Sequence, residues 1–303
     1  MELLKTMCSI FAPAGEEDLM TQFVLNYIEN NKSKWKVKPE IFSGKGFQNC
    51  VVLVFGKPRT AIFAHLDSIG FTARYNNNLV KVGGPRTENG FKLIGHDSQG
   101  TIETELKVAE DKSLSCDYNR TIEPGTNLVF KPEWLEDEDF LQCCYMDNRL
   151  GVYNALKVAE TLEDGIICFS CWEESGGGAA EFLAKFIYEK YEVDQALISD
   201  ITWVTEGVEA GKGCVISLRD SGIPRKSFTN KIRAIANKHN LQYQIEVESS
   251  GGSDGNAIHS TSYPIDWCFV GAPEQNVHTP TEKVHKKDIA SMIELYKVLT
   301  KEL

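Results

Sequence analysis

Apolar residues along this chain follow two different spacings. Apolar side chains three and four positions apart predict amphipathic helices in four places: residues 16–30, 150–162, around 183–187 and 289–299. Short apolar runs rich in β-branched and aromatic residues predict buried strands in six others: residues 51–55, 61–64, 166–171, 196–199, 214–218 and 266–270. This alternation is typical of an α/β fold in which a mostly parallel central sheet carries helices on both faces.

The stretch from 71 to 138 has a different pattern. Strand-like pieces such as GTIETELKV alternate there with turn sequences such as NNN, DSQG and EPG, and no helical spacing interrupts them. We therefore predict a small β domain at 71–138, inserted into an α/β domain made of residues 1–70 and 139–303. The alternative is a set of long surface hairpins on a single domain.

Composition narrows the class of protein. The 303 residues are 42% hydrophobic and 25% charged, and no stretch approaches the ~18 consecutive apolar residues of a membrane span. The formal net charge of −11 argues against a nucleic-acid partner, which needs a basic face. There are nine cysteines, and Cys168 and Cys171 lie in an apolar run that favours buried thiols. Without a secretory signal at the start, we expect a cytoplasmic protein with no membrane partner.

Two adjacent glutamates stand out in ICFSCWEESGGG. Glu173 and Glu174 follow a buried apolar run directly, and three glycines come soon after them. Repulsion and desolvation both oppose two like charges at such a position unless positive charge lies close by. Taken alone, the pair has a simpler interpretation as the first turn of a helix, where acids suit the helix dipole.

Other polar residues lie where predicted strands stop. An α/β sheet gathers its chemistry outside the carboxyl ends of its strands. Imidazole or carboxylate groups occur at five such strand ends or adjoining loops: His65 with Asp67, Asp147, the glutamate pair, Asp200 and His278. Each residue alone is explained as well by a turn, a helix cap or a structural histidine. Together they favour a borderline divalent ion such as Zn²⁺, Co²⁺ or Mn²⁺.

Five segments resemble, in order, those of metallopeptidase family forty-two, the glutamyl and tetrahedral aminopeptidases, some of which carry an endoglucanase-like name. The segments are AHLDSIGF, DNRLG, WEES, ISD and HTPTEKV, which begin at residues 64, 147, 172, 198 and 278. Each segment is weak evidence by itself, but their order spans nearly the whole chain. The resemblance implies a di-zinc exopeptidase type of α/β fold and hydrolysis of N-terminal residues from peptides.

The resemblance also implies a site with two divalent metal ions, zinc being the first candidate and cobalt or manganese the others. Asp147 would bridge the ions, with His65 and Asp200 on one of them and Glu174 and His278 on the other. A metal-activated water would be the nucleophile, and Glu173 the general base and acid. Asp67 would accept a hydrogen bond from His65, because residues two apart on a strand share a face.

The chain departs from the family pattern at a few positions. Asn148 replaces a second aspartate, Ser68 a glutamate and Ser175 a valine; none of these is an implied ligand. The chain is also short for the family, which leaves a smaller homo-oligomer or a monomer open beside the twelve-subunit assembly. The inserted domain is expected to serve oligomerisation or substrate access. The roles of Arg149, Asp254 and His259 stay open.

Three other functions are compatible with part of the pattern. A glycoside hydrolase needs two acids facing one bond across a sugar, and neighbouring strand residues such as Glu173 and Glu174 would point apart. Another metal-dependent amide hydrolase, such as a carboxypeptidase, dipeptidase or deacylase, would use the same ligands. A non-catalytic binding protein would keep the fold without needing the complete set of ligands and base.

Overall fold

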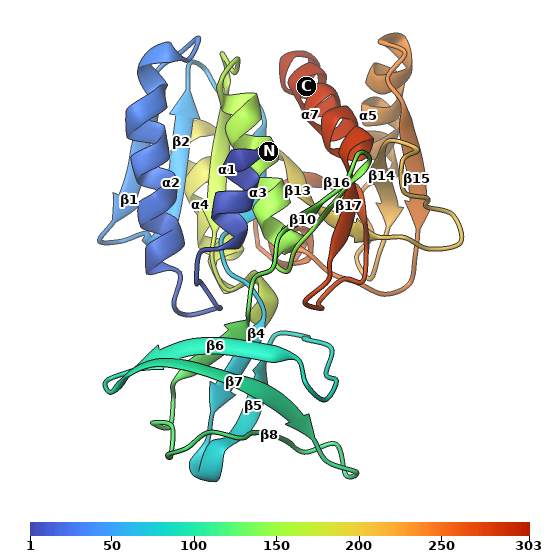
Figure 1. Ribbon diagram of the computed structural model, residues 1–303. Helices are drawn as coiled ribbons and strands as arrows, with labels where there is room; N and C mark the ends of the chain where they lie inside the picture. Colours follow the sequence, from blue (N-terminus) through green and yellow to red (C-terminus); the bar gives the residue numbers. More distant parts are fainter.

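The computed structural model describes all 303 residues and divides into an α/β part and a smaller β-barrel (Figure 1). The helices are α1 (Glu2–Cys8), α2 (Asp18–Asn31), α3 (Met146–Ala159), α4 (Gly178–Tyr191), α5 (Lys226–Lys238), α6 (Asp254–His259) and α7 (Lys286–Glu302). All four helices predicted from apolar spacing are present, as α2, α3, α4 and α7. The amphipathic helix α5 was missed.

A mixed sheet of eleven strands organises the α/β part. Its strands are β1 (Glu40–Gly44), β2 (Gln48–Phe55), β3 (Ala61–His65), β10 (Leu135–Glu136), β11 (Phe140–Gln142), β12 (Gly165–Ser170), β13 (Gln195–Trp203), β14 (Cys214–Arg219), β15 (Tyr243–Val247), β16 (Asp266–Gln275) and β17 (Lys283–His285). The neighbours β12, β3, β13 and β16 are parallel, and antiparallel strands flank them. The sequences of β3 and β12, apolar up to a polar last residue and buried at every position, fit strands that are covered on both faces.

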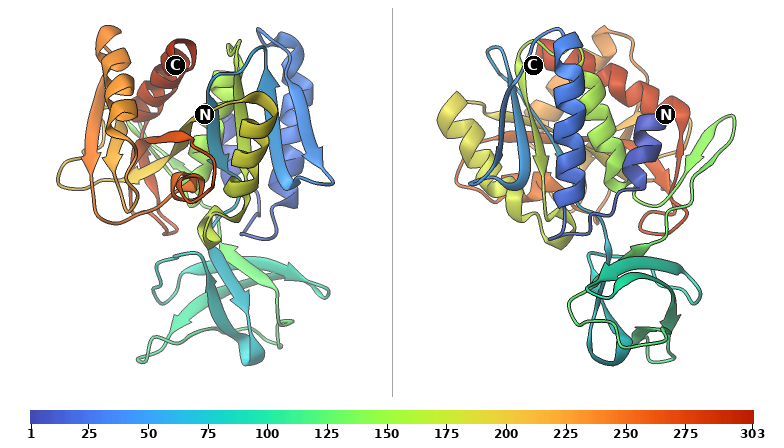
Figure 2. Two further views of the ribbon diagram at one scale, coloured as in Figure 1. Left: turned by 180° about the vertical axis from the view of Figure 1, so that it is seen from behind. Right: turned by 60° about the vertical axis from the view of Figure 1, so that its left-hand side comes forward.

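Helices cover both faces of this sheet (Figure 2). Helices α1, α2, α3 and α7 lie on one face, α4 and α6 lie on the other, and α5 packs beside α7 and β14. The predicted α/β fold class is therefore confirmed. All nine cysteines are free and buried, and no helix is long and apolar enough to cross a membrane.

The second part is a closed six-stranded barrel with the order β4-β5-β8-β7-β6-β9. Its strands are β4 (Gly70–Ala73), β5 (Asn78–Val82), β6 (Lys92–Asp97), β7 (Gly100–Val108), β8 (Leu114–Cys116) and β9 (Asn127–Phe130). Closure pairs β9 with β4, so this stretch does not form separate surface hairpins. After the barrel, β10 and β11 pair with each other and with β17 of the large sheet. The role of the barrel in oligomerisation or substrate access stays a prediction.

Candidate metal centre

The carboxylate of Asp147 lies between two histidine rings. Its Oδ1 is 3.1 Å from Nε2 of His65, and its Oδ2 is 3.1 Å from Nε2 of His278. His65 ends β3, whereas His278 lies in the loop between β16 and β17. Each oxygen of one carboxylate therefore faces a different imidazole, as a bridging group requires.

Two further carboxylates approach these rings from opposite sides of Asp147. Oδ2 of Asp200 is 3.6 Å from Nε2 of His65, and Oε2 of Glu174 is 3.6 Å from Nε2 of His278. The structure thus brings together all five predicted ligands, with His65 paired to Asp200 and His278 to Glu174. Asp200 lies inside β13 and not at its end, because that strand continues to Trp203.

The second ring nitrogen of each histidine is already engaged. Nδ1 of His65 is 3.1 Å from the backbone oxygen of Asp67, and Nδ1 of His278 is 3.1 Å from the backbone oxygen of Gly84. A carbonyl can only accept, so both Nδ1 atoms donate, which leaves Nε2 as the free donor atom for a metal. The carboxylate of Asp67 is more distant from His65 Nδ1, at 3.5 Å.

Asp67 has a function that the sequence did not predict. Its carboxylate accepts hydrogen bonds from the backbone N–H groups of Glu173 at 3.1 Å and Glu174 at 3.0 Å. These two glutamates form a 3₁₀ turn, not the end of a strand, because Trp172 takes a left-handed backbone conformation with φ 60°. The prediction that Glu173 and Glu174 are neighbouring strand residues, whose side chains point apart for that reason, was therefore wrong. The turn, held by Asp67, sets their directions.

A buried glutamate fixes the backbone on the other side of the centre. Glu282 is fully buried, and it accepts hydrogen bonds from the N–H of Asp147 at 3.3 Å and of His278 at 3.0 Å. His278 itself has φ 65°, a conformation that a non-glycine residue keeps only when its surroundings hold it. The segment HTPTEKV contains Glu282, but nothing in its spacing showed that this side chain would hold the backbone of Asp147 and His278.

The barrel loop that contains Gly83, Gly84 and Arg86 lies against Glu174 and His278. A Cβ atom at Gly83 would lie 2.9 Å from Glu174 Oε2, and one at Gly84 would lie 3.2 Å from His278 Nδ1. The backbone N–H of Arg86 also donates to the oxygen of His278, at 2.9 Å. The backbone at Gly83, which has φ 68°, therefore favours glycine where the barrel meets the candidate ligands, and the barrel helps to position His278.

Negatively charged groups outnumber positively charged groups around Asp147. Burial alone would raise the pKa of Asp147, but hydrogen bonds with His278 and His65 outweigh it and lower that pKa. Burial and the charge of Asp147 instead hold the pKa values of Glu174 and Asp200 well above the usual range. These carboxylates are close enough to repel each other, so the cluster lacks positive charge.

Glu173 shows the same effect in a more exposed position. Burial first, and then the charges of Asp254, Asp147 and Asp67, raise its pKa to about 8 despite the opposing effect of His65. Its side chain is 16% exposed and lines the same cavity as Asp147 and Asp200. A carboxylate with a raised pKa beside a cavity is a candidate general base.

The two residues that follow Asp147, Asn148 and Arg149, do not line the cavity. Arg149 is fully buried and donates to the backbone oxygens of Leu66 and Asp67, so it supports that loop and does not face a substrate. Asn148 donates to Ser199 O at 2.9 Å and accepts from Gly151 N. Its replacement of an aspartate therefore alters the packing of α3 more than the cavity.

Asp254 and His259 are also outside the pocket. Asp254 is buried and hydrogen-bonded to the hydroxyl of Ser170. His259 is exposed, with Nδ1 3.5 Å from the indole nitrogen of Trp267. Neither residue lines the cavity that contains Asp147, so neither touches a molecule bound there.

The donor set fits a metal of borderline hardness. His65, Asp147 and Glu174 each offer a ligand atom, and these atoms all lie within 4.8 Å of one another. Oε1 of Glu174 is buried without a hydrogen-bond partner, although a buried carboxylate oxygen is normally paired. Imidazole nitrogen with carboxylate oxygen suits zinc and its neighbours.

Comparison with known proteins bears on the family and the fold of the chain. A model of the M42 glutamyl aminopeptidase family matches residues 101–295. A curated relative from Acetivibrio thermocellus, provisionally named an aminopeptidase, is 23% identical over 97% of this chain and 96% of its own. An aminopeptidase structure from the archaeon Desulfurococcus kamchatkensis has a TM-score of 0.87 at 23% identity, covering 100% of this chain and 94% of the other.

The TET1 peptidase of Pyrococcus horikoshii has a TM-score of 0.83 at 22% identity, covering 100% of this chain and 99% of the other. At these identities the structural likenesses establish a shared fold. Since the family model matches well over half of its length, the chain belongs to the M42 glutamyl aminopeptidase family and is a peptidase.

Proposed function

We propose that the protein is an aminopeptidase that uses two divalent metal ions, zinc being the first candidate. Asp147 would bridge the two ions, with His65 and Asp200 on one and His278 and Glu174 on the other. One observation carries the proposal: each oxygen of Asp147 lies 3.1 Å from the free Nε2 of a different histidine. A single ion would use only one of the two pairs, His65 with Asp200 or His278 with Glu174, and would leave the other pair without a metal.

The metal ions would supply the positive charge that acidifies a water molecule and polarises the scissile carbonyl. Glu173 would take the proton of that water and pass it to the leaving amine, as its position in the cavity allows. Asp67 would keep Glu173 and Glu174 oriented through their backbone N–H groups. Glu282 would do the same for Asp147 and His278.

The test is chelation followed by metal replacement. We expect the chelated protein to lose activity, and Zn²⁺, Co²⁺ or Mn²⁺ to restore it at two ions per chain, measured by elemental analysis. The substrates are peptides with a free N-terminus, N-acylated peptides, and peptides that differ only at the C-terminus. Turnover of only N-blocked substrates would favour a deacylase on the same site, and release from the C-terminus would favour a carboxypeptidase.

We also propose that the chain forms a homo-oligomer. The TET1 peptidase of Pyrococcus horikoshii is described as assembling into a tetrahedron or a large octahedral shell, and it shares this fold over the full chain. Light scattering after size exclusion tests the proposal. A particle of 33.9 kDa, the mass of one chain, would contradict it.

A further inference from the structure

The cavity at the candidate metal centre continues well past the five ligands. Its volume is about 280 Å³, and it extends along β13 to residues on β15 and on the loop after β14. Thr202 lies two positions after Asp200 on β13 and therefore points to the same face of the sheet. Two strand residues span about 6.6 Å. The far end of the cavity therefore begins beside Thr202, two strand residues along β13 from the candidate ligand Asp200.

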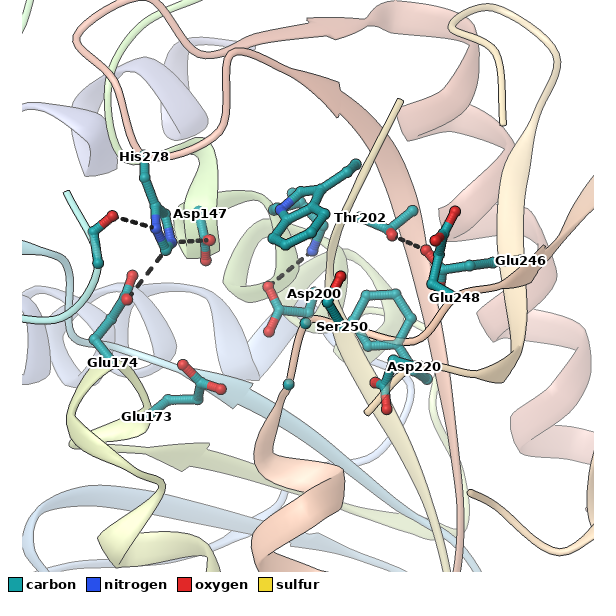
Figure 3. Close-up of a pocket in the computed structure, with 16 residues that line it drawn as sticks. Asp147, Glu173, Glu174, Asp200, Thr202, Asp220, Glu246, Glu248, Ser250 and His278 are labelled. Carbon is teal, nitrogen blue, oxygen red and sulfur yellow. Dashed lines mark hydrogen bonds and ion pairs between the residues drawn. The ribbon is translucent and has the colours of Figure 1, made fainter. Parts of the chain in front are cut away.

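Three carboxylates form the far end: Asp220, Glu246 and Glu248, here named the acid wall. Asp220 and Glu246 are only 7% and 5% exposed. Glu246 accepts a hydrogen bond from the hydroxyl of Thr202, and Asp220 accepts one from the N–H of Gly222 at 2.5 Å. Figure 3 shows the acid wall on the opposite side of the pocket from Glu174.

No basic group neutralises these acids. The residues that line the cavity include seven carboxylates but neither lysine nor arginine. Burial raises the pKa of Asp220 and Glu246, and the charges of Asp220 and Glu248 raise that of Glu246 further, with no nearby cation opposing the effect. Buried acids are normally paired with a cation or a metal, and the two more buried acids lack one although they line an open cavity.

The charge balance separates this end from the metal end. Two divalent ions would offset the four carboxylates of Asp147, Glu173, Glu174 and Asp200. The three carboxylates of the acid wall would remain without a counter-charge. Apolar side chains of Ile201, Trp203 and Phe269 line the same cavity. An occupant with an apolar stem and a cationic tip would satisfy both sets of groups.

We propose that the acid wall is the subsite for the side chain of the substrate's first residue and that it selects lysine or arginine there. This inference rests on the proposed aminopeptidase function. The ammonium or guanidinium group would reach Asp220 and Glu246, and its methylene stem would lie along Phe269 and Trp203. An N-terminal glutamate would instead meet three like charges, even though the family is described as glutamyl aminopeptidases.

The metal-loaded enzyme tests the inference with aminoacyl p-nitroanilides of lysine, arginine, Nε-acetyllysine, leucine and glutamate. We expect kcat/KM for lysine to exceed that for Nε-acetyllysine at least about tenfold, because acetylation removes the positive charge. Since the acetyl group also lengthens the side chain, the shorter uncharged side chain of leucine is the second comparison, and lysine should exceed it as well. Glutamate should be the poorest substrate. Preference for leucine or glutamate over both basic residues would overturn the inference, while the proposed aminopeptidase function would stand.

Variants distinguish recognition of the side chain from recognition of the α-amino group. In Asp220→Asn and Glu246→Gln, we expect the lysine-to-leucine ratio of kcat/KM to fall about tenfold or more. Equal losses for both substrates would overturn the inference, because every substrate carries the same α-amino group. Glu248→Gln, at the half-exposed part of the wall, provides a variant with less risk to folding. Glu110→Gln, on an exposed barrel loop, is the charge-matched control.

Binding gives a readout that does not depend on turnover. Calorimetry with lysinamide and leucinamide on the metal-loaded protein should show tighter binding of lysinamide, reduced in Asp220→Asn. If no aminoacyl substrate is cleaved but lysinamide is still preferred, the proposed function fails and the cationic subsite stands. Equal binding of the two amides would overturn the subsite.

Discussion

The two ends of the cavity use the same kind of side chain under different conditions. At the metal end, Asp147 faces two histidine nitrogens, and backbone donors tie the neighbouring glutamates to Asp67. At the acid wall, Asp220 and Glu246 are buried without any cation. The metal end carries groups that can hold a permanent counter-charge within the protein. The acid wall lacks them, so its counter-charge must come from the molecule that binds.

The largest effect should come from Glu173, which distinguishes chemistry from metal binding. We expect Glu173→Gln to lower kcat by about 10²–10⁴-fold, the usual contribution of a positioned base. The amide is almost the same size and cannot take a proton, so elemental analysis should still find the full metal content.

Ser175→Ala is a suitable control for Glu173→Gln, because Ser175 lies on the exposed part of the same turn. Activity of the glutamine variant within a fewfold of wild type would remove the assigned role. Loss of metal together with activity would instead make Glu173 a ligand.

Asp67 tests how far the metal end depends on residues that touch no substrate. In Asp67→Asn, one acceptor oxygen becomes an NH₂ group that faces the N–H of either Glu173 or Glu174. We expect metal affinity or activity to fall about 10–100-fold, as for other groups that orient ligands. Zinc titration with a competing chelator measures the affinity. Unchanged affinity and activity would show that the turn keeps its shape without this carboxylate.

Metal binding should depend on pH through the carboxylates of the metal end and not through those of the acid wall. The pKa of Glu173 is about 8, so its carboxyl group holds a proton at neutral pH without a metal, and the pKa values of Glu174 and Asp200 are raised as well. Bound cations would lower these pKa values and expel the protons. Apparent zinc affinity should therefore rise with pH between 6 and 8, about tenfold per pH unit for each proton released.

Calorimetry of zinc binding in buffers with different ionisation enthalpies counts these protons directly. A pH-independent affinity with no proton release would contradict the charge imbalance at the metal end. The double variant Asp220→Asn with Glu246→Gln should release the same number of protons, since the acid wall holds no metal.

The sequence predicted the metal end far better than the acid wall. His65, Asp147 and His278 lie in short segments whose order resembles a known family, and buried apolar runs marked most of the large sheet. The 3₁₀ turn of Glu173 and Glu174 was missed because the left-handed backbone of Trp172 ends the strand early. Asp220 and Glu246 carry no local signal. They meet only because β14 and β15 pair in parallel, with Ser217 opposite Glu246.

The smallest predicted effect concerns the hydroxyl of Thr202, which joins the two ends. It donates to Glu246, and it lies two residues from Asp200. Thr202→Val keeps the shape but removes this donor, so the pKa of Glu246, which that hydrogen bond lowers, should rise. We expect the preference for lysine over leucine to fall about fivefold, as for one hydrogen bond of ~1 kcal/mol. Thr202→Ser keeps the hydroxyl and should retain the preference. Equal behaviour of the valine and serine variants would show that the hydroxyl does not maintain the charge of the acid wall.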